Sequence, residues 1–343
     1  MPDAYTKLRS DTAESRLARL ADGFLATQLL YVAAELRLAD ALADQPRTAA
    51  ELAEKVGADP GVLRRVLRGL AAEQVLDELP DGRFALAPSG ELLREGVPGS
   101  LRGPVLARGG LYYGAMAGLL PSALGGGTPF DLVHGMTFFA YLDAHPERSA
   151  TFQASMTARS AREAAAVVDA YDFRPFRTIV DVGGGKGGLL GAVLEAAPEL
   201  AGVLFDRPEV VRDAGLPAVG GDFFVEVPAG ADAYLLSRVI HDWDDADAVA
   251  ILRTCRRAMA AWGRLLLVEA VLPDRAADQP AAVRMDLHML NLLRGRERTA
   301  GEFAELLDAA GLELTDVIAA DKSTGLHVLE ARCPGAALPT PGH

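Results

Sequence analysis

The sequence predicts an α/β fold in which a doubly wound sheet follows a mainly helical N-terminal region. Three observations support this prediction. A β-branched run ends in the glycine-rich stretch TIVDVGGGKGG at residues 178–188. After it, apolar runs of strand length alternate with helical patterns, as in a parallel sheet covered on both faces. Before it, apolar residues recur at the three- and four-residue steps of helices.

Length and composition exclude several classes of protein. The 343 residues are enough for about two domains of roughly 150 residues each. No apolar run reaches the roughly 18 residues of a membrane span, and the N-terminus lacks an apolar signal core, so we expect a cytoplasmic protein without a membrane partner. The formal charge of −13 argues against nucleic acid as a partner, because phosphate binding needs a basic face. Cys255 and Cys333 lack metal-ligand spacing, and we expect no metal.

Residues 1–100 are expected to form a dimerisation domain. From Arg16 to Ala43 the apolar residues lie on more than one side of the predicted helices, so this segment needs a partner. The partner that we expect is a second copy of the chain, which gives a homodimer. Between residues 48 and 93 the sequence predicts two capped helices and two short strands joined by a turn at 80–82, which is a winged-helix arrangement.

The second helix of this arrangement carries Arg64, Arg65 and Arg68, where a DNA-binding protein would need basic residues. A solvated basic stripe on a dimerisation module is the other interpretation. We favour the dimerisation module, because the chain is acidic and a cofactor-binding sequence follows.

The remaining chain divides into three predicted segments. Residues 101–170 form a helical linker and substrate-pocket segment, in which aromatic and methionine side chains such as Met156 recur at helical spacing. Such a stripe also fits plain core packing. Residues 171–334 form the cofactor-binding domain, and residues 335–343 form a disordered tail rich in proline and glycine.

The glycine stretch marks a cofactor site without choosing the cofactor. A strand, a glycine turn and a helix start place bare backbone N–H groups beside a ligand. Gly183, Gly185 and Gly188 satisfy the dinucleotide pattern GxGxxG. Asp181 with Gly183, Gly185 and Gly187 satisfies the pattern DxGxGxG equally well. Taken alone, the stretch is therefore ambiguous.

Acidic residues after successive strands favour S-adenosylmethionine over a nicotinamide dinucleotide. Asp181 places an acceptor at the turn, where it suits a ligand ammonium and would repel a pyrophosphate. Asp206 closes the second strand, where ribose hydroxyls bind. Asp222 follows with Phe223, an aromatic residue suited to flank an adenine ring. An amino-acid head, a ribose and a base in that order describe S-adenosylmethionine.

Three further residues end up at the same edge of the predicted sheet. His241 ends the fourth strand, Glu269 ends the next strand, and Glu297 precedes the following helix. Because ligands bind at the carboxyl ends of such strands, we expect an imidazole base and two supporting carboxylates in one crevice. Either glutamate could instead cap a helix or pair with an arginine, such as Arg298.

Six stretches together carry a specific resemblance to one family. They are YLLSRVIHDWDD, DVGGGKGG, LFDRPEVV, GDFF, VEAVLP and MDLHMLNLLRGRERTAGEFAELLDAAG. They resemble the S-adenosylmethionine-dependent small-molecule O-methyltransferases, which include plant phenolic enzymes and bacterial polyketide and antibiotic-tailoring enzymes. The resemblance extends from about residue 16 to residue 332. It implies a Rossmann-like class I methyltransferase sheet behind an N-terminal winged-helix dimerisation domain.

The resemblance also implies roles for individual residues. His241 would be the general base, with Glu269 and Glu297 as its supports. The residues implied in cofactor binding are Asp181, Gly183, Gly185, Asp206, Asp222, Phe223, Ser237, Arg238 and Trp243. The residues implied on the substrate side are Met156, Asp242, Asp286, His288 and Met289. The chain departs from the family pattern at Arg294, where many members have glycine, and at His288, where an apolar residue is common and which could bind substrate or face solvent.

The expected function is methyl transfer from S-adenosylmethionine to a hydroxyl of an aromatic or polycyclic small molecule, as in natural-product biosynthesis. One alternative is a cofactor-retaining relative that catalyses decarboxylation, hydroxylation or cyclisation. A second alternative is a metabolite-sensing regulator that binds DNA through the winged helix. The presence of His241 favours methylation.

Overall fold

The structure is a computed structural model that describes residues 12–335, apart from the side chains of Thr157 and Ala158. The predicted disordered tail lies outside the described residues except for its first residue. Contacts divide the chain into two compact units, Met1–Gly114 with Pro146–Ala158 and Ala115–His145 with Arg159–His343. The predicted linker segment 101–170 is therefore shared between the two units. Among the described residues, no helix combines the length and the apolar content that a membrane crossing requires.

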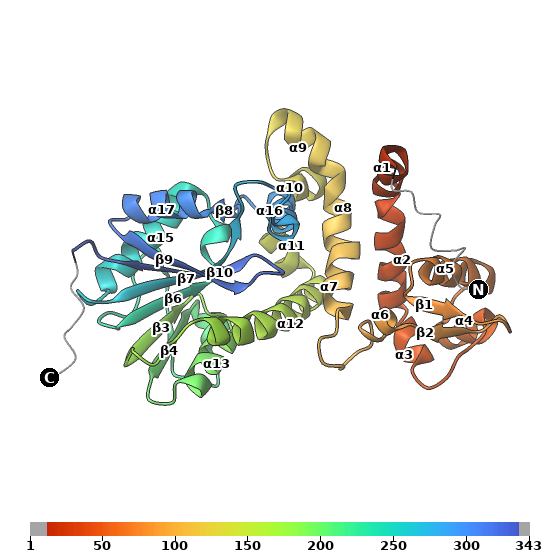
Figure 1. The fold of residues 1–343 in the computed structure, drawn as a ribbon, viewed down its shortest axis with the longest axis horizontal. Coiled ribbons are helices and arrows are strands. Elements are labelled where there is room, and N and C mark those ends of the chain that lie inside the picture. Colours follow the sequence, from red (N-terminus) through yellow and green to blue (C-terminus); the bar gives the residue numbers. More distant parts are fainter. Residues whose placement is uncertain (1–11, 336–343) are drawn as a thin grey trace. The chain divides into compact units, whose positions relative to one another are not determined.

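The first unit is mainly helical, and Figure 1 shows its helices together with a two-stranded hairpin. Its elements are α1 (Ala13–Ala21), α2 (Gly23–Glu35), α3 (Leu38–Leu42), α4 (Ala49–Val56), α5 (Pro60–Ala72), β1 (Leu76–Glu78), β2 (Phe84–Leu86), α6 (Pro88–Glu91), α7 (Arg102–Ala107) and a π-helical turn (Arg108–Tyr112), followed by α8 (Tyr113–Ala115), whose last residue belongs to the second unit. Its core is formed by apolar residues of α3, α4, α5 and the hairpin, such as Leu42, Leu52, Leu67 and Phe84.

The residues predicted to begin and end the N-terminal helices α4 and α5 are confirmed in these roles. Thr48 and Glu51 form both hydrogen bonds of a capping box at the start of α4, and Gly57 ends that helix with φ 71°. Asp59 caps α5 by accepting from the N–H of Val62. The two strands pair antiparallel around the predicted turn. The predicted order of helix, helix and hairpin is thus present.

The second unit contains an eight-stranded mixed sheet. Its strands are β3 (Thr178–Val182), β4 (Ala201–Asp206), β5 (Ala218–Gly220), β6 (Ala233–Ser237), β7 (Arg264–Leu272), β8 (Arg298–Thr299), β9 (Glu313–Asp321) and β10 (Leu326–Arg332). The main order is β5-β4-β3-β6-β7-β10-β9, and β8 pairs with β7. This is the doubly wound arrangement that the alternating pattern predicts.

The expectation of a parallel sheet is wrong for the last two strands. β3 to β7 run parallel to their neighbours, but β10 is antiparallel to both β7 and β9. The physical reason is the short connection at 322–325, since a parallel crossover needs about a dozen residues or more and a hairpin needs only a few. The short strands β5 and β8 are additions that the apolar pattern did not indicate.

Helices cover both faces of this sheet (Figure 1). The second unit contains the helices α9 (Leu119–Gly125), α10 (Pro129–His134), α11 (Phe138–Ala144), the later part of α12 (Pro146–Ala170), α13 (Gly188–Ala196), α14 (Pro208–Val211), α15 (Asp245–Ala258), α16 (Pro280–Leu292) and α17 (Ala300–Ala309). Along β6, Tyr234 and Leu236 pack with α15 and α17, whereas Ala233 and Leu235 pack with α12 and α13. The strand is buried on both faces, and only its carboxyl end is left for chemistry.

Candidate active site

The turn after β6 is held by one carboxylate from the neighbouring strand. Arg238 follows the strand in a left-handed conformation with φ 57°, and a 3₁₀ turn then covers Ile240–Asp242. Oε1 of Glu269, on β7, accepts hydrogen bonds from the N–H groups of Val239 at 3.1 Å, Ile240 at 2.9 Å and His241 at 3.4 Å. Glu269 therefore fixes the backbone from which the imidazole extends.

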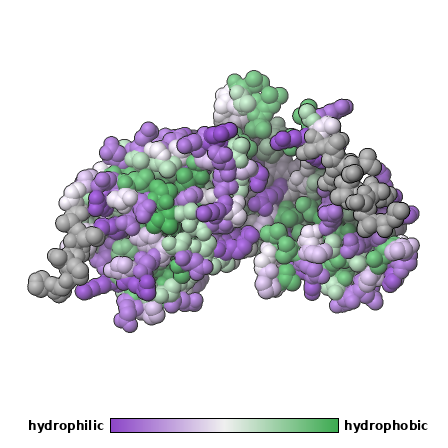
Figure 2. All heavy atoms as spheres, in the orientation of Figure 1, coloured by the Kyte–Doolittle hydropathy of each residue, from purple (hydrophilic) through white to green (hydrophobic). Residues whose placement is uncertain are grey.

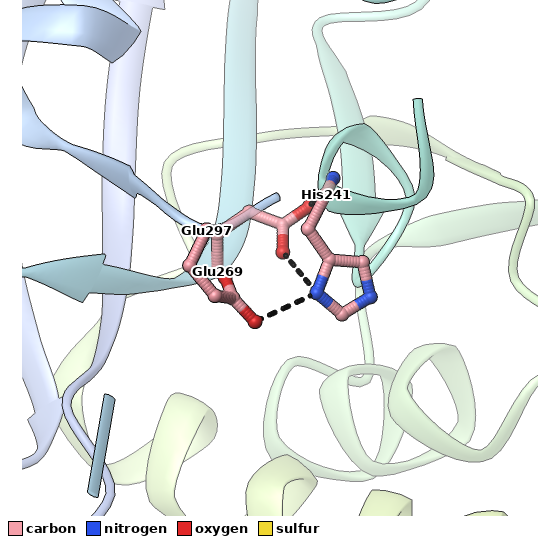
Figure 3. A group of neighbouring side chains, drawn as sticks. All are labelled: His241, Glu269 and Glu297. Carbon is pink, nitrogen blue, oxygen red and sulfur yellow. Dashed lines mark hydrogen bonds and ion pairs between the residues drawn. The ribbon is translucent and has the colours of Figure 1, made fainter. Parts of the chain in front are cut away.

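The predicted imidazole and two carboxylates do lie together (Figure 3). Nδ1 of His241 lies 2.9 Å from Oε1 of Glu297 and 3.7 Å from Oε2 of Glu269. All three residues are buried. An ionised carboxylate only accepts hydrogen bonds, so Nδ1 carries the proton and, in the neutral ring, Nε2 is the basic nitrogen. Nε2 lies 3.4 Å from Oδ1 of Asp242.

The surroundings of His241 favour its protonated form. Burial lowers the pKa of the imidazole, but the negative charges of Glu269 and Glu297 outweigh burial and raise the pKa to about 9. Burial raises the pKa of Glu269 to about 7. For Glu297, the attraction to His241 overcomes the effect of burial and lowers the pKa. The cluster can therefore accept a proton on Nε2 and stabilise the resulting imidazolium.

The loop before β8 brings Glu297 to the histidine. The N–H of Glu297 donates to Oδ1 of Asp286 on α16 at 3.0 Å, so Asp286, expected on the substrate side, positions the loop. A Cβ atom at Gly295 would overlap the carbonyl oxygen of His241, which explains why glycine occupies this position. The departure at Arg294 leaves this contact intact, because Gly295 is the glycine that touches the histidine.

The alternative that Glu297 pairs with Arg298 is wrong. The fully buried guanidinium of Arg298 bonds Asp245 at 2.8 Å and donates to the carbonyl oxygens of Ile240 and Trp243. It thus fixes the segment on the other side of His241 and leaves Glu297 for the imidazole.

A buried group of charges was missed by sequence reasoning. Arg238, expected in the cofactor wall, has a side chain that bonds Glu163 of α12 through two nitrogens, at 2.7 and 3.2 Å. Its Nη1 lies 3.5 Å from Oε1 of Glu297. Arg159 binds the same Glu163 at 2.8 Å. The one signal in the sequence is the four-residue spacing of Arg159 and Glu163, which is common on helix surfaces.

The glycine turn and its acidic residues fit a ligand that carries an ammonium group. Asp181 is buried behind the turn, and a Cβ atom at Gly184 would overlap its carboxylate. Its Oδ1 has no hydrogen-bond partner, and burial together with the charge of Asp206 raises the pKa of Asp181 to about 7. A buried acceptor without a donor is costly unless a ligand supplies one. Asp206 accepts from the N–H of Gly185 at 2.9 Å, which ties β4 to the turn.

An aromatic cluster lies next to this turn. Phe223 and Trp243 meet edge to face with ring centroids 5.9 Å apart, and Phe224, which the sequence did not single out, contacts both. The ring of Phe223 is 3.7 Å from the position of a Cβ atom at Gly183. Asp222 is exposed and accepts from the N–H of Phe224. The three aromatic rings offer apolar surface beside the glycine turn.

The remaining residues predicted to contact ligands are distributed as follows. Ser237 is half-buried at the end of β6. Met289 is buried on α16, and His288 is half-buried beside it. Met156 is half-buried on the part of α12 that belongs to the first unit.

His241, Glu269 and Glu297 also meet a distance criterion for a metal site, since their ligand atoms lie within 4.8 Å of one another. The chemistry of these atoms does not suit a cation. Oε1 of Glu269 already accepts hydrogen bonds from three N–H groups, and Nδ1 of His241 already donates a hydrogen bond to Glu297. Arg238 already places a positive charge 3.5 Å from Oε1 of Glu297. The arrangement fits the holding of a proton better than the holding of a metal ion.

Comparisons with known proteins agree with this geometry. The family model of the O-methyltransferase domain matches residues 120–313, and that of the O-methyltransferase dimerisation domain matches residues 18–95. Phenazine O-methyltransferase PhzM of Lysobacter antibioticus is 44% identical over 93% of this chain and 96% of its own. O-demethylpuromycin-O-methyltransferase of Streptomyces alboniger is 40% identical over 93% and 89%.

A solved structure of an O-methyltransferase from neocarzinostatin biosynthesis has a similar fold. It was determined in complex with S-adenosylmethionine and 2-hydroxy-5-methyl naphthoic acid. It superposes with a TM-score of 0.78 at 34% identity and covers 90% of this chain and 96% of its own.

The close approach of Gly295 to His241 predicts that Gly295→Ala destabilises the protein by about 1 to 3 kcal/mol, because the methyl group meets backbone that cannot rotate away. The matched control is Gly191→Ala on α13, where an added Cβ meets nothing within 4 Å. The control should be neutral or stabilising by up to about 1 kcal/mol. Urea unfolding measures both changes, and equal midpoints for Gly295→Ala and the unmodified protein would contradict the predicted overlap.

Proposed function

This chain belongs to the O-methyltransferase family, and we propose that it transfers a methyl group from S-adenosylmethionine to a hydroxyl of an aromatic or polycyclic small molecule in natural-product biosynthesis. The observation that carries this proposal is the His241–Glu297 bond, which leaves Nε2 as a buried base at the carboxyl edge of the sheet. An aromatic acceptor is supported by the phenazine O-methyltransferase and the O-demethylpuromycin-O-methyltransferase among the relatives, and by the related structure solved with 2-hydroxy-5-methyl naphthoic acid.

The residues around the glycine turn fit the cofactor. Asp181 would take the ammonium of the methionine part, Asp206 would take hydroxyls of the ribose, and Asp222 would lie near the adenine. Phe223 and Trp243 would flank the adenine. When bound, the cofactor supplies a methyl group on a positively charged sulfur, which is electrophilic without further activation.

The task of His241 is to remove the acceptor proton. As the methyl group left the sulfur of the cofactor for the acceptor oxygen, with S-adenosylhomocysteine as the leaving group, the O–H bond of the acceptor would break and Nε2 of His241 would take the proton. A phenol with a pKa of about 10 and an ordinary histidine of about 6.5 differ by roughly 5 kcal/mol in proton affinity. The carboxylates raise the pKa of His241 to about 9, which removes most of this difference and brings the proton transfer close to balance.

The test of the function is a reaction with S-adenosylmethionine labelled in its methyl group and a panel of hydroxylated phenazines and naphthoic acids. The unmodified enzyme should give a product heavier by one methylene. His241→Gln should reduce kcat by about 10² to 10⁴ while the cofactor still binds, because only the general base is lost. Full activity of that variant would reject the base assignment. A mass change other than one methylene would favour decarboxylation, hydroxylation or cyclisation.

The raised pKa of His241 predicts the pH dependence of the reaction. Neutral His241 is the active base, so kcat/KM for the acceptor should fall as pH decreases through the pKa of this residue. Because the carboxylates raise that pKa, the midpoint of the acid limb should lie above the ordinary value of about 6.5. Initial rates between pH 5 and pH 10 measure it. A midpoint at or below 6.5 would contradict the raised pKa.

We also propose that the chain forms a homodimer through its N-terminal domain. The dimerisation-domain match supports this proposal, as do exposed apolar residues of α1 and α2, namely Leu17, Leu20, Phe24 and Leu25. Such a row of exposed apolar side chains is typical of an interface. A second apolar surface lies on α9, where Leu120 and Leu124 are exposed (Figure 2).

Light scattering should therefore give twice the chain mass of 36.1 kDa. Replacing Leu20 and Phe24 together by glutamate should shift the mass toward that of one chain, since two buried charges per subunit would oppose association. Val225→Glu, at an exposed position of the second unit, is the matched control and should leave the mass unchanged. A double variant with the mass of two chains would contradict the assignment of the interface.

A further inference from the structure

A series of alternating charges extends from α12 to the imidazole, entirely within the second unit. It consists of Arg159, Glu163, Arg238, Glu297 and His241. Successive contacts measure 2.8 Å between Arg159 and Glu163, 2.7 Å between Glu163 and Arg238, 3.5 Å between Arg238 and Glu297, and 2.9 Å between Glu297 and His241. The function proposed above uses only the last pair.

We propose that Glu163 and Arg238 are positioning residues that set the proton affinity of His241 through Glu297, and that they act in opposite directions. This inference rests on the proposed function only for its kinetic readout. Arg238 places a positive charge beside the carboxylate that holds Nδ1, and so weakens the attraction of that carboxylate for the imidazolium. Glu163 is ion-paired with Arg238 and offsets its positive charge, and so restores the attraction of Glu297 for the imidazolium.

The geometry of Arg238 supports this division of roles. Glu163 binds two nitrogens of the guanidinium, while Nη1 makes no hydrogen bond and keeps a distance of 3.5 Å from Oε1 of Glu297. Oε1 of Glu297 therefore remains the partner of His241. Without Glu163, the guanidinium would be free to bond Glu297 and compete with the imidazole.

Burial makes these charges effective. The side chains of Glu163 and Arg238 are each 13% exposed, and that of Glu297 is fully buried. Burial raises the pKa of Glu163, but the charges of Arg159 and Arg238 outweigh it and hold the pKa at about 2, so Glu163 stays ionised at every working pH. Charges in such a site are screened less than charges at the surface.

The imidazole is faced by charged and titratable groups from several elements. They are Asp242 beside it, Glu269 on β7, Glu297 and Arg298 at β8, Arg238 after β6, Asp286 on α16, and Arg159 with Glu163 on α12. Each test variant below changes one of them and keeps the others. A shift in the titration of His241 therefore reports the charge that was changed.

The experiment compares Arg238→Gln and Glu163→Gln in the full-length enzyme. The quantity measured is the midpoint pH of the acid limb, which is the fall of kcat/KM as pH decreases. Loss of the positive charge of Arg238 should move the limb to higher pH, and loss of the negative charge of Glu163 should move it to lower pH, each by about half a unit or more. Arg238→Lys and Glu163→Asp keep the charges and should retain a limb close to that of the unmodified enzyme. Purely structural roles would lower activity without moving the two limbs in opposite directions.

Shifts in the same direction, or no shift in either variant, would overturn the proposal. If a central variant does not fold, Arg159→Gln takes its place, because loss of this outer positive charge leaves Glu163 less neutralised and should move the limb to higher pH. The same comparison is made by NMR titration of isotope-labelled histidine, with His241→Gln identifying the signal of His241. This titration needs no substrate, so it separates failure of the inference from failure of the proposed function.

Discussion

The position of the imidazole depends on one carboxylate, that of Glu269. A single oxygen of this side chain accepts three consecutive N–H groups of the turn after β6. The turn includes a left-handed residue that is not glycine, a conformation that costs of order 1 kcal/mol or more and persists only when its surroundings hold it. β7 is buried and paired on both sides, so the carboxylate that it carries is fixed. The remainder of the site is arranged around this anchor.

Much of the fold could be predicted because its signals are local. Caps at Thr48 and Asp59, glycine at 57 and apolar runs at 178–182 and 264–272 each mark an element through residues that are adjacent in the chain. The direction of β10 could not be predicted in this way. It depends on whether the connection after β9 is a hairpin or a crossover. The alternation of strands and helices stops at β9, so it does not predict a parallel β10.

The site was predictable to the extent that strand ends specify it. His241 and Glu297 could be brought together from sequence because His241 follows β6 and Glu297 comes directly before β8 and α17. Glu269 was expected to end its strand, and this is wrong, because β7 continues to Leu272 and Glu269 lies within it. The contact between Glu163 and Arg238 joins residues 75 positions apart and depends on how α12 lies against the sheet. The role of Asp286 as a partner of the Glu297 amide depends likewise on the placement of α16. No spacing rule encodes such contacts between a helix and a loop.

The left-handed conformation of Arg238 has a consequence for attempts to transplant this chemistry. A designer who grafts an imidazole and two carboxylates onto another parallel sheet would copy the visible side chains and miss the backbone that aims them. The graft would also need a residue tolerant of positive φ that still bears a cation, and a glycine opposite the carbonyl of the histidine. Glycine or asparagine would relax the first position but would remove its charge. The transferable unit is therefore two loops and their strands, and not three residues.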